Sequence, residues 1–441
     1  MIPANREEGL KKVIGIPELS LSIINSIIGA GIFALPGIIG VALGAFGIVG
    51  FIFCGIMMAA IMLCYAEIGT KVTSSGGSYA YVEAAFGSLP SYIVNWLYFF
   101  GWGMMGSAAL VNIIADSLAV IFPVFMDPFP RGILFFILIS FMVLVNIRGA
   151  RQGILVVKMI TIIKILPLIA LIVFGTGLIK TTNLYWDKLP SFQTFGGSML
   201  VLFFAFAGFE TCLGASGEIK EPKKTIPWGI LIGATVVLVL YMFLQMVTQG
   251  VLGDQIALYK DAPLAAVAAR IVGSKGATIL LLAAAISCFG SVFMDILATP
   301  RNLFAMSKDG LFPVFFSKVH KRYATPYWAI LFYGGGIFLF SISGGFKQLA
   351  SLASAAILLI YLAVVLAMVK LRKQKELRGQ FFKAPGGWIT PIIGTATICW
   401  LLTSLSRTEI ISTLVFIAIV ILFFYISRML KKPSIVVKIN K

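Results

Sequence analysis

The stretch IIGAGIFALPG, from Ile27 to Gly37, lies inside the first hydrophobic segment of the chain and carries Gly29, Gly31 and Pro36 as well as Gly37. Glycine and proline are the poorest helix formers, so four of them within one apolar segment predict an interrupted helix. An interruption needs a physical reason, and that reason depends on the solvent around the segment.

Composition identifies that solvent as lipid. Of the 441 residues, 59% are hydrophobic and only 12% are charged. The surface of a water-soluble globule needs far more polar side chains than this. The apolar runs are about 18 to 30 residues long, which suits helices that cross about 30 Å of hydrocarbon and does not suit alternating barrel strands. The chain is therefore expected to be an all-α integral membrane protein.

The apolar runs predict twelve transmembrane helices in a single domain that covers residues 1–441. Because the linkers are short, no separate soluble domain is expected. Span boundaries read from sequence carry an error of a few residues. The spans are expected at about residues 18–42, 47–69, 91–121, 133–149, 153–178, 195–217, 227–251, 277–306, 326–343, 348–370, 389–405 and 410–428.

Basic residues predict the orientation. With a cytoplasmic N-terminus, 25 of the 35 Lys and Arg residues lie on the cytoplasmic side, 8 lie outside and 2 lie within the fifth span. This bias places both termini in the cytoplasm. The net charge of +18 then reflects topology and attraction to anionic lipid rather than nucleic-acid binding. The five cysteines show no metal-ligand spacing, and neither a cofactor nor a metal is expected.

Broken helices survive in a membrane only where they line a cavity or bind something, so an interruption marks a site. A second interruption is expected in LFFAFAGFETCLGASGE, residues 202–218, in the sixth span. Two broken spans five apart are typical of transporters built from inverted repeats. The half-helix ends offer free N–H groups to a carboxylate and free C=O groups to an ammonium, which together match one small zwitterion.

Four motifs carry a resemblance to a known family. They are IIGAGIFALPG, then SSGGSYAYVEAAFG after the second span, FAFAGFET with EIKEPKKTIPWGI through the sixth, and ATPRNLFAMSKDGLFP at the end of the eighth. In this order and spacing they resemble the amino acid, polyamine and organocation (APC) transporter superfamily over about residues 15 to 420. The resemblance implies the LeuT fold: repeat one at about 18–178, repeat two at about 195–370, and peripheral helices at about 389–428.

The resemblance also implies substrate contacts at the two breaks. The substrate carboxylate is expected at the amides of Ala30 and Gly31. Its amino group is expected at the carbonyls of Ile27, Phe204 and Ala207. The aromatic ring that closes over the substrate in such transporters corresponds to Phe204 or Phe206, of which Phe206 is the predicted gating residue.

Two ionisable residues lie deep in apolar segments. Lys164 is expected near the membrane midplane, where a charge costs about 2.5–3.5 kcal/mol, so it should face the interior of the bundle. In sodium-independent relatives a lysine at this place stands where sodium-coupled members bind sodium, and it either carries a proton or is a fixed charge. Glu210 matches a gating or proton-linked glutamate of the family.

Asp295 and Ser107 complete the set of candidates. Asp295 is expected either to line the side-chain pocket and favour a cationic substrate, or to pair with Lys164 and leave a neutral pocket, or to lie outside the site. Ser107 aligns with a pocket residue of the third span.

These features predict a secondary amino-acid transporter of the cytoplasmic membrane, sodium-independent and coupled to protons. An amino-acid exchanger is the alternative mechanism, and an amino-acid receptor or sensor is the alternative of another class. A channel has no use for breaks that wrap a zwitterion. No catalytic constellation is recognisable, so no enzyme is expected. Amino acid, protons and lipid are the expected partners, without an accessory subunit, because no cysteine lies in an outer loop.

Overall fold

The computed structural model describes residue 12 and residues 14–430, apart from 30, 75, 149–152, 187–188, 261, 309–311, 324 and 375–380. Within these residues all regular elements are helices, and the one β-like feature is an isolated bridge between Ile14 and Ile219. The prediction of an all-α protein is therefore confirmed for the part of the chain that the structure describes.

The α-helices follow one another with short connections, and a π-helical stretch, η2 (Leu97–Met105), joins the two halves of one long helix. Their bounds are α1 Ile16–Ile27, α2 Gly31–Leu43, α3 Gly47–Lys71, α4 Gly77–Phe86, α5 Ser88–Trp96, α6 Gly106–Ile121, α7 Pro128–Arg148, α8 Gly153–Gly175, α9 Phe192–Phe206, α10 Phe209–Cys212, α11 Pro222–Leu252, α12 Pro263–Val272, α13 Ser274–Ala298, α14 Pro300–Lys308, α15 Tyr327–Ser343, α16 Phe346–Lys373, α17 Ile389–Thr403 and α18 Arg407–Leu430.

Short 3-10 helices turn the chain between these elements. They are η1 Gly44–Phe46, η3 Pro123–Met126, η5 Thr176–Leu178, η6 Thr181–Leu184, η7 Leu213–Glu218, η8 Gly253–Tyr259 and η9 Val314–Ser317.

The surface of the helix bundle is apolar, as expected of a protein in lipid. Among the described residues, eight helical stretches are long and apolar enough to cross a membrane, and five shorter apolar helices accompany them. Large apolar side chains face outward along several helices; Leu166 on α8 is 66% exposed and Leu414 on α18 is 60% exposed. Contiguous exposed apolar surface of this kind is rare on soluble monomers. The fold is thus that of a helical membrane protein.

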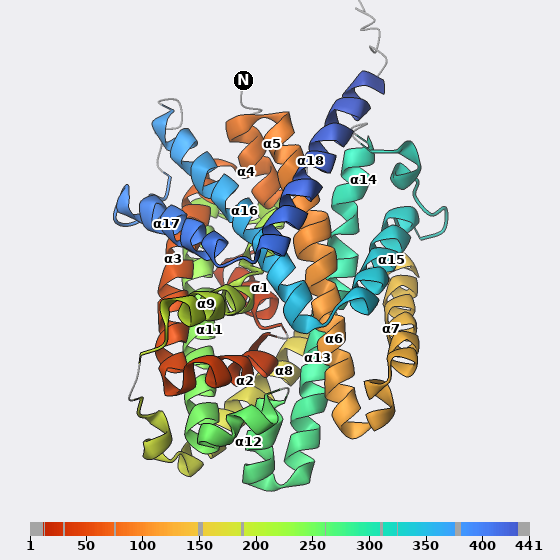
Figure 1. The fold of residues 1–441 in the computed structure, drawn as a ribbon. Coiled ribbons are helices and arrows are strands. Elements are labelled where there is room, and N and C mark those ends of the chain that lie inside the picture. Colours follow the sequence, from red (N-terminus) through yellow and green to blue (C-terminus); the bar gives the residue numbers. More distant parts are fainter. Residues whose placement is uncertain are drawn as a thin grey trace, which may run out of the picture.

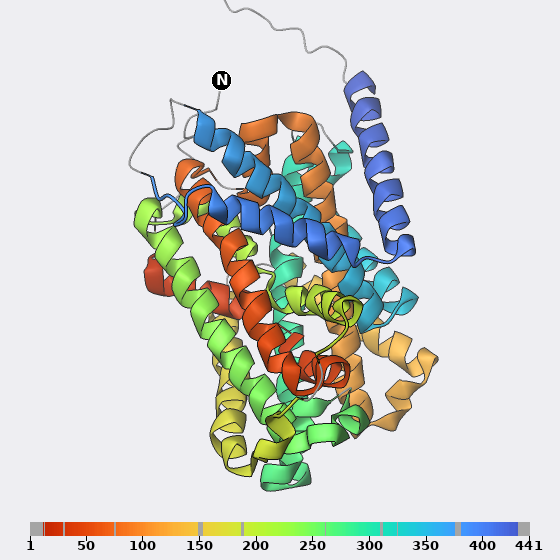
Figure 2. The same ribbon diagram turned by 60° about the vertical axis from the view of Figure 1, so that its left-hand side comes forward.

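The long helices α3, α6, α11, α13 and α16 run along the length of the molecule (Figure 1). Helices α4 and α5 lie toward one end of the molecule, α12 lies at the opposite end, and α1 lies between them (Figure 1). Helix α18 lies on the outside of the bundle (Figure 2). Inside the bundle α1 packs against α11, and α13 packs against α6 and α8.

Two short helices, α4 and α12, occupy segments that the sequence was expected to use as linkers. Of the two, α12 is amphipathic. Helix α12 buries Leu264, Val267 and Ala268 on one face and leaves Arg270 and Val272 less covered. A ten-residue helix of this kind is too short to cross the membrane, so the length of an apolar run alone does not reveal it.

Both segments expected to contain breaks are divided. The first is split into α1 and α2 around Ile28 and Gly29. In the second, α9 ends because Ala207 turns extended and Gly208 follows with a φ of +114°. A side chain at that φ is strained, so glycine suits this position.

Candidate functional site

The two interruptions lie side by side. The Ser26 hydroxyl near the end of α1 donates a hydrogen bond of 2.7 Å to the carbonyl of Gly208. The approach is so close that a Cβ on Gly208 would lie 2.9 Å from the Ser26 carbonyl oxygen, and one on Gly31 would lie 3.2 Å from Cα of Ala205. Backbone atoms of segments almost two hundred residues apart in sequence therefore form a single junction.

The carbonyls at the end of α1 accept hydrogen bonds from two other helices, α8 and α11. The ammonium of Lys164, on α8, donates to the carbonyls of Asn25 at 2.7 Å and Ile28 at 2.6 Å. The Tyr241 hydroxyl, on α11, donates to the carbonyl of Ile27 at 3.1 Å. Ala30, which was predicted with Gly31 to bind the substrate carboxylate, lies outside the described residues.

Lys164 is almost completely buried, with 1% of its surface exposed. No ion pair joins it to a carboxylate among the residues that the structure describes, so its positive charge is compensated by carbonyl dipoles. Carbonyl oxygens at the end of a half-helix are also the ligands that unwound transporter helices offer to a metal cation. In this structure the Lys164 ammonium is bonded to two such carbonyls.

The second break is organised by Glu210. Its Oε2 atom accepts hydrogen bonds from the backbone N–H of Gly208 at 3.0 Å and from the Tyr361 hydroxyl at 2.5 Å. The carboxyl group is 2% exposed, and its Oε1 atom accepts no hydrogen bond within the described part of the chain. The Tyr361 ring packs at 5.4 Å from the ring of Tyr65. Glu210 therefore links the interrupted helix to α16.

The two candidate aromatic rings of the sixth span point to different neighbours. The Phe204 ring lies 5.6 Å from Trp102 and 5.9 Å from Phe346. The Phe206 ring lies 5.4 Å from the ring of Tyr241, within the main apolar core. Residues two apart on a helix point about 200° apart, so only one of the pair can face a given cavity.

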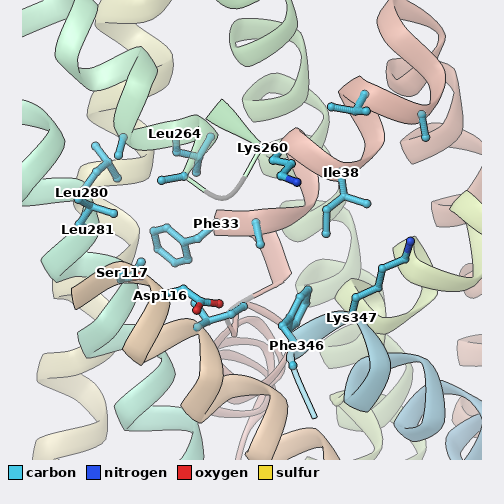
Figure 3. A pocket seen from close by; sticks show the side chains of 18 residues that line it. Phe33, Ile38, Asp116, Ser117, Lys260, Leu264, Leu280, Leu281, Phe346 and Lys347 are labelled. Carbon is cyan, nitrogen blue, oxygen red and sulfur yellow. The ribbon is translucent and has the colours of Figure 1, made fainter. Parts of the chain in front are cut away.

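A cavity of about 540 Å³ lies near the junction, and Phe204 is not among its lining residues. Phe346, the ring neighbour of Phe204, forms part of its wall together with Phe33 of α2 (Figure 3). Most of the remaining wall is apolar. Charged side chains in the lining are Asp116, Lys260 and Lys347.

The junction is packed on its other side, toward the end of the molecule that holds α4. Ile14 pairs with the segment after η7: its N–H donates to the carbonyl of Glu218 at 3.1 Å, and its carbonyl accepts from Lys220 at 2.9 Å. The N–H of Gly76 donates to the carbonyl of Gly214 at 3.0 Å. Backbone contacts therefore close the junction on this side.

Asp295 and Ser107 lie together, apart from Lys164. The Asp295 carboxylate accepts hydrogen bonds from the hydroxyls of Ser107 at 2.7 Å, Thr299 at 2.6 Å and Tyr333. These donors belong to three stretches of chain, so the carboxylate ties α6 and α15 to α13. Neither Asp295 nor Ser107 contributes to the lining of the cavity.

Sequence reasoning missed the hydroxyl donors Tyr241, Tyr361 and Ser287, of which Ser287 donates to the carbonyl of Gly29 at 3.2 Å. The signal that could have identified these donors is the presence of a polar side chain in an apolar span. Many such side chains only bond to their own helix, as Ser341 and Thr248 do. The signal is therefore weak without knowledge of which helix faces the break.

A helical membrane protein with two adjacent helix interruptions beside a cavity is a membrane transporter in architecture, and the comparisons with known proteins agree. The chain belongs to the amino acid permease family of the APC superfamily, whose model matches residues 14–437. This is a family of transporters and not of enzymes.

Three relatives from Bacillus subtilis are similar over almost their whole length. The branched-chain amino acid permease BcaP is 28% identical, covering 96% of this chain and 94% of that protein. The methylthioribose transporter is 26% identical, with 96% and 95% covered. The serine/threonine exchanger SteT is 26% identical, with 92% and 94% covered. Their names indicate different substrates and modes of transport, so the comparisons support amino acid transport only in general terms.

Proposed function

We propose that this protein is a secondary amino-acid transporter that works by alternating access. It has twelve transmembrane spans in one domain with the LeuT-type arrangement of two inverted five-helix repeats, in which α1 with α2 and α9 with α10 form the two broken spans. The hydrogen bond between Ser26 and Gly208 supports the proposal, because it brings the two breaks into one junction. Transporters with this repeat bind their substrate where broken helices meet.

The substrate binds mainly through the backbone of the junction. Its carboxylate lies at the amides of Ala30 and Gly31, at the beginning of α2, and its ammonium lies at the carbonyls of Ile27, Phe204 and Ala207. Main-chain recognition reads the zwitterion that all amino acids share. Phe204 is a better candidate than Phe206 for the ring that closes over the substrate, because it contacts Phe346 in the wall of the cavity.

Transport is independent of sodium. The observation that carries this proposal is the position of the Lys164 ammonium, which donates to the carbonyls of Asn25 and Ile28. A cation that is part of the chain removes the need for a bound sodium ion. We favour proton symport, in which Lys164 or Glu210 takes up and releases the transported proton as the site changes its facing side. An exchanger, with Lys164 as a permanent charge, is the second candidate, and the similarity to SteT favours it.

The protein lies in the cell membrane with both termini in the cytoplasm. The distribution of basic residues supports this orientation. Because the N-terminal end of α1 is then cytoplasmic, the packed side of the junction faces the cytoplasm and the cavity opens outward. The structure corresponds to an outward-facing state of the transporter. The protein functions in lipid and without an accessory subunit.

The test is uptake of radiolabelled amino acids by purified protein in liposomes, in sodium-free buffer, with and without an inward proton gradient. Accumulation driven by the gradient is expected. Uptake only into liposomes preloaded with amino acid, indifferent to the gradient, would replace symport by exchange. Specific binding without uptake under either condition would favour a receptor and refute the transport function.

A further inference from the structure

The cavity near the junction has an apolar interior and a charged rim. Its apolar lining comes from five helices and includes Phe33, Ile38, Leu264, Leu280, Leu281 and Phe346 (Figure 3). An ammonium that enters such a space without a partner loses its hydration, and burying an unpaired charge is strongly unfavourable. The interior therefore suits an uncharged side chain.

The rim carries more positive than negative charge. Lys260, between η8 and α12, and Lys347, at the beginning of α16, are both exposed side chains of the lining. The backbone of Lys260 lies close to α2. A Cβ added to Gly37 of α2 would lie 3.0 Å from the Cα atom of Lys260. The carboxylate of the lining, Asp116, is paired with Arg131 at 2.7 Å. Among the lining residues that the structure describes, positive charge therefore exceeds negative charge at the entrance.

The buried carboxylates near the junction are engaged elsewhere. Asp295 accepts hydrogen bonds from three hydroxyl groups on both of its oxygens and does not reach the cavity lining. Glu210 bonds to Gly208 and Tyr361 on the packed side of the junction. A basic substrate side chain would therefore pass two like charges and reach an apolar space without a counter-charge.

We infer that the protein selects neutral amino acids with apolar side chains, and that Lys260 and Lys347 exclude basic amino acids at the entrance. This inference rests on the proposed transport function and names the substrate class of that same site. Like charges placed along an entry path suppress wrong ligands, while the substrate carboxylate is attracted to them. Lys260 and Lys347 are thus specificity-determining residues that do not need to touch the bound substrate.

The experiment uses norleucine and lysine, which have the same carbon skeleton and differ by the terminal ammonium. Both are tested as competitors of the uptake of a radiolabelled neutral amino acid in liposomes. The expected result for the natural protein is inhibition by norleucine at concentrations at least about tenfold lower than by lysine. Lysine that competes as well as norleucine overturns the inference.

The double variant Lys260→Glu, Lys347→Glu reverses both rim charges, and Lys275→Glu is the matched control, since Lys275 is exposed at the beginning of α13 and does not line the cavity. The preference for norleucine is the ratio of the lysine concentration to the norleucine concentration that gives equal inhibition of uptake. We expect the double variant to lower this ratio by about tenfold and the control to leave it unchanged. An unchanged preference in a double variant that still transports refutes the role of the two lysines. Failure of every amino acid in a broad panel to enter liposomes would refute the transport function itself, which is a different outcome.

Discussion

Replacing Gly208 by alanine tests whether the junction of the two breaks is the working part of the molecule. Gly208 has a φ of +114°, and a Cβ there would lie 2.9 Å from the carbonyl oxygen of Ser26. The added methyl group therefore meets two independent obstacles, a strained backbone and a collision with α1. The collision with α1 is relieved only when α9 and α1 move apart.

The free-energy cost of Gly208→Ala is the sum of the costs of these two obstacles. A non-glycine residue with positive φ costs about 1–2 kcal/mol. Overpacking a site by one methyl group costs about 1–3 kcal/mol more. Since each 1.4 kcal/mol is about tenfold in an equilibrium, the sum of roughly 2–5 kcal/mol predicts a loss of the junction geometry of about 30- to 4,000-fold.

Alanine variants at two other glycines of the chain separate the cost of backbone strain from the cost of the collision. Gly44 also has positive φ, at +55°, but a Cβ there meets nothing within 4 Å, so Gly44→Ala carries only the backbone strain. Gly197, on α9, has open space and a helical backbone, so Gly197→Ala carries neither cost. The assay is the initial rate of amino-acid uptake into liposomes, with the apparent Tm in detergent measured in parallel to detect unfolding.

We expect Gly197→Ala to transport like the natural protein, Gly44→Ala to lose stability slightly, and Gly208→Ala to lose nearly all uptake. If Gly208→Ala folds and transports within about threefold of Gly44→Ala, the contact between the two breaks does not matter for transport and the reasoning is wrong.

Three further substitutions test separate parts of the molecule. Lys164→Met removes the ammonium from the carbonyls of α1, and we expect uptake to lose its response to a proton gradient while exchange of internal for external amino acid continues; a gradient response of natural size would contradict this. Phe204→Ala should weaken substrate competition roughly tenfold, whereas Phe206→Ala, in the core, should mainly lower the apparent Tm; equal effects on competition would remove the distinction. Glu67→Gln leaves Lys71 and Arg372 without their buried carboxylate, which costs about 3–5 kcal/mol when one partner of a buried pair is lost, so the apparent Tm should fall by several degrees. The exposed Glu83→Gln is its control, and an unchanged Tm in both variants would show that the buried pair contributes nothing.

The positions of the breaks could be predicted because their cause is local. Glycine and proline weaken a helix wherever they stand, and Gly208 takes a backbone angle that other residues avoid. The depth of Lys164 in its segment was likewise readable from counting residues. The helical class followed from composition, since lipid leaves few other solutions for a long apolar chain.

The partners of the ionisable residues could not be predicted, because they depend on how each helix is rotated about its axis. The sequence allowed three positions for Asp295: in the substrate pocket, paired with Lys164, or outside the site. In the structure the rotation of α13 directs Asp295 to Ser107 and Tyr333, while α8 directs Lys164 to backbone carbonyls. Similarly, the sequence left Phe204 and Phe206 as candidates for the closing ring, and only the structure shows that Phe204 contacts Phe346 while Phe206 contacts Tyr241.

The hydrogen bonds at the end of α1 also indicate which carbonyl a substrate can recruit. The Ile28 carbonyl holds a charged donor at 2.6 Å, and charge-assisted hydrogen bonds are about twice as strong as neutral ones. The Ile27 carbonyl holds only the neutral Tyr241 hydroxyl, at 3.1 Å. An incoming ammonium therefore displaces Tyr241 more easily than Lys164. The proposed substrate contact at Ile27 and the hydrogen bond of the Lys164 ammonium are therefore compatible, because each uses a different carbonyl at the same end of α1.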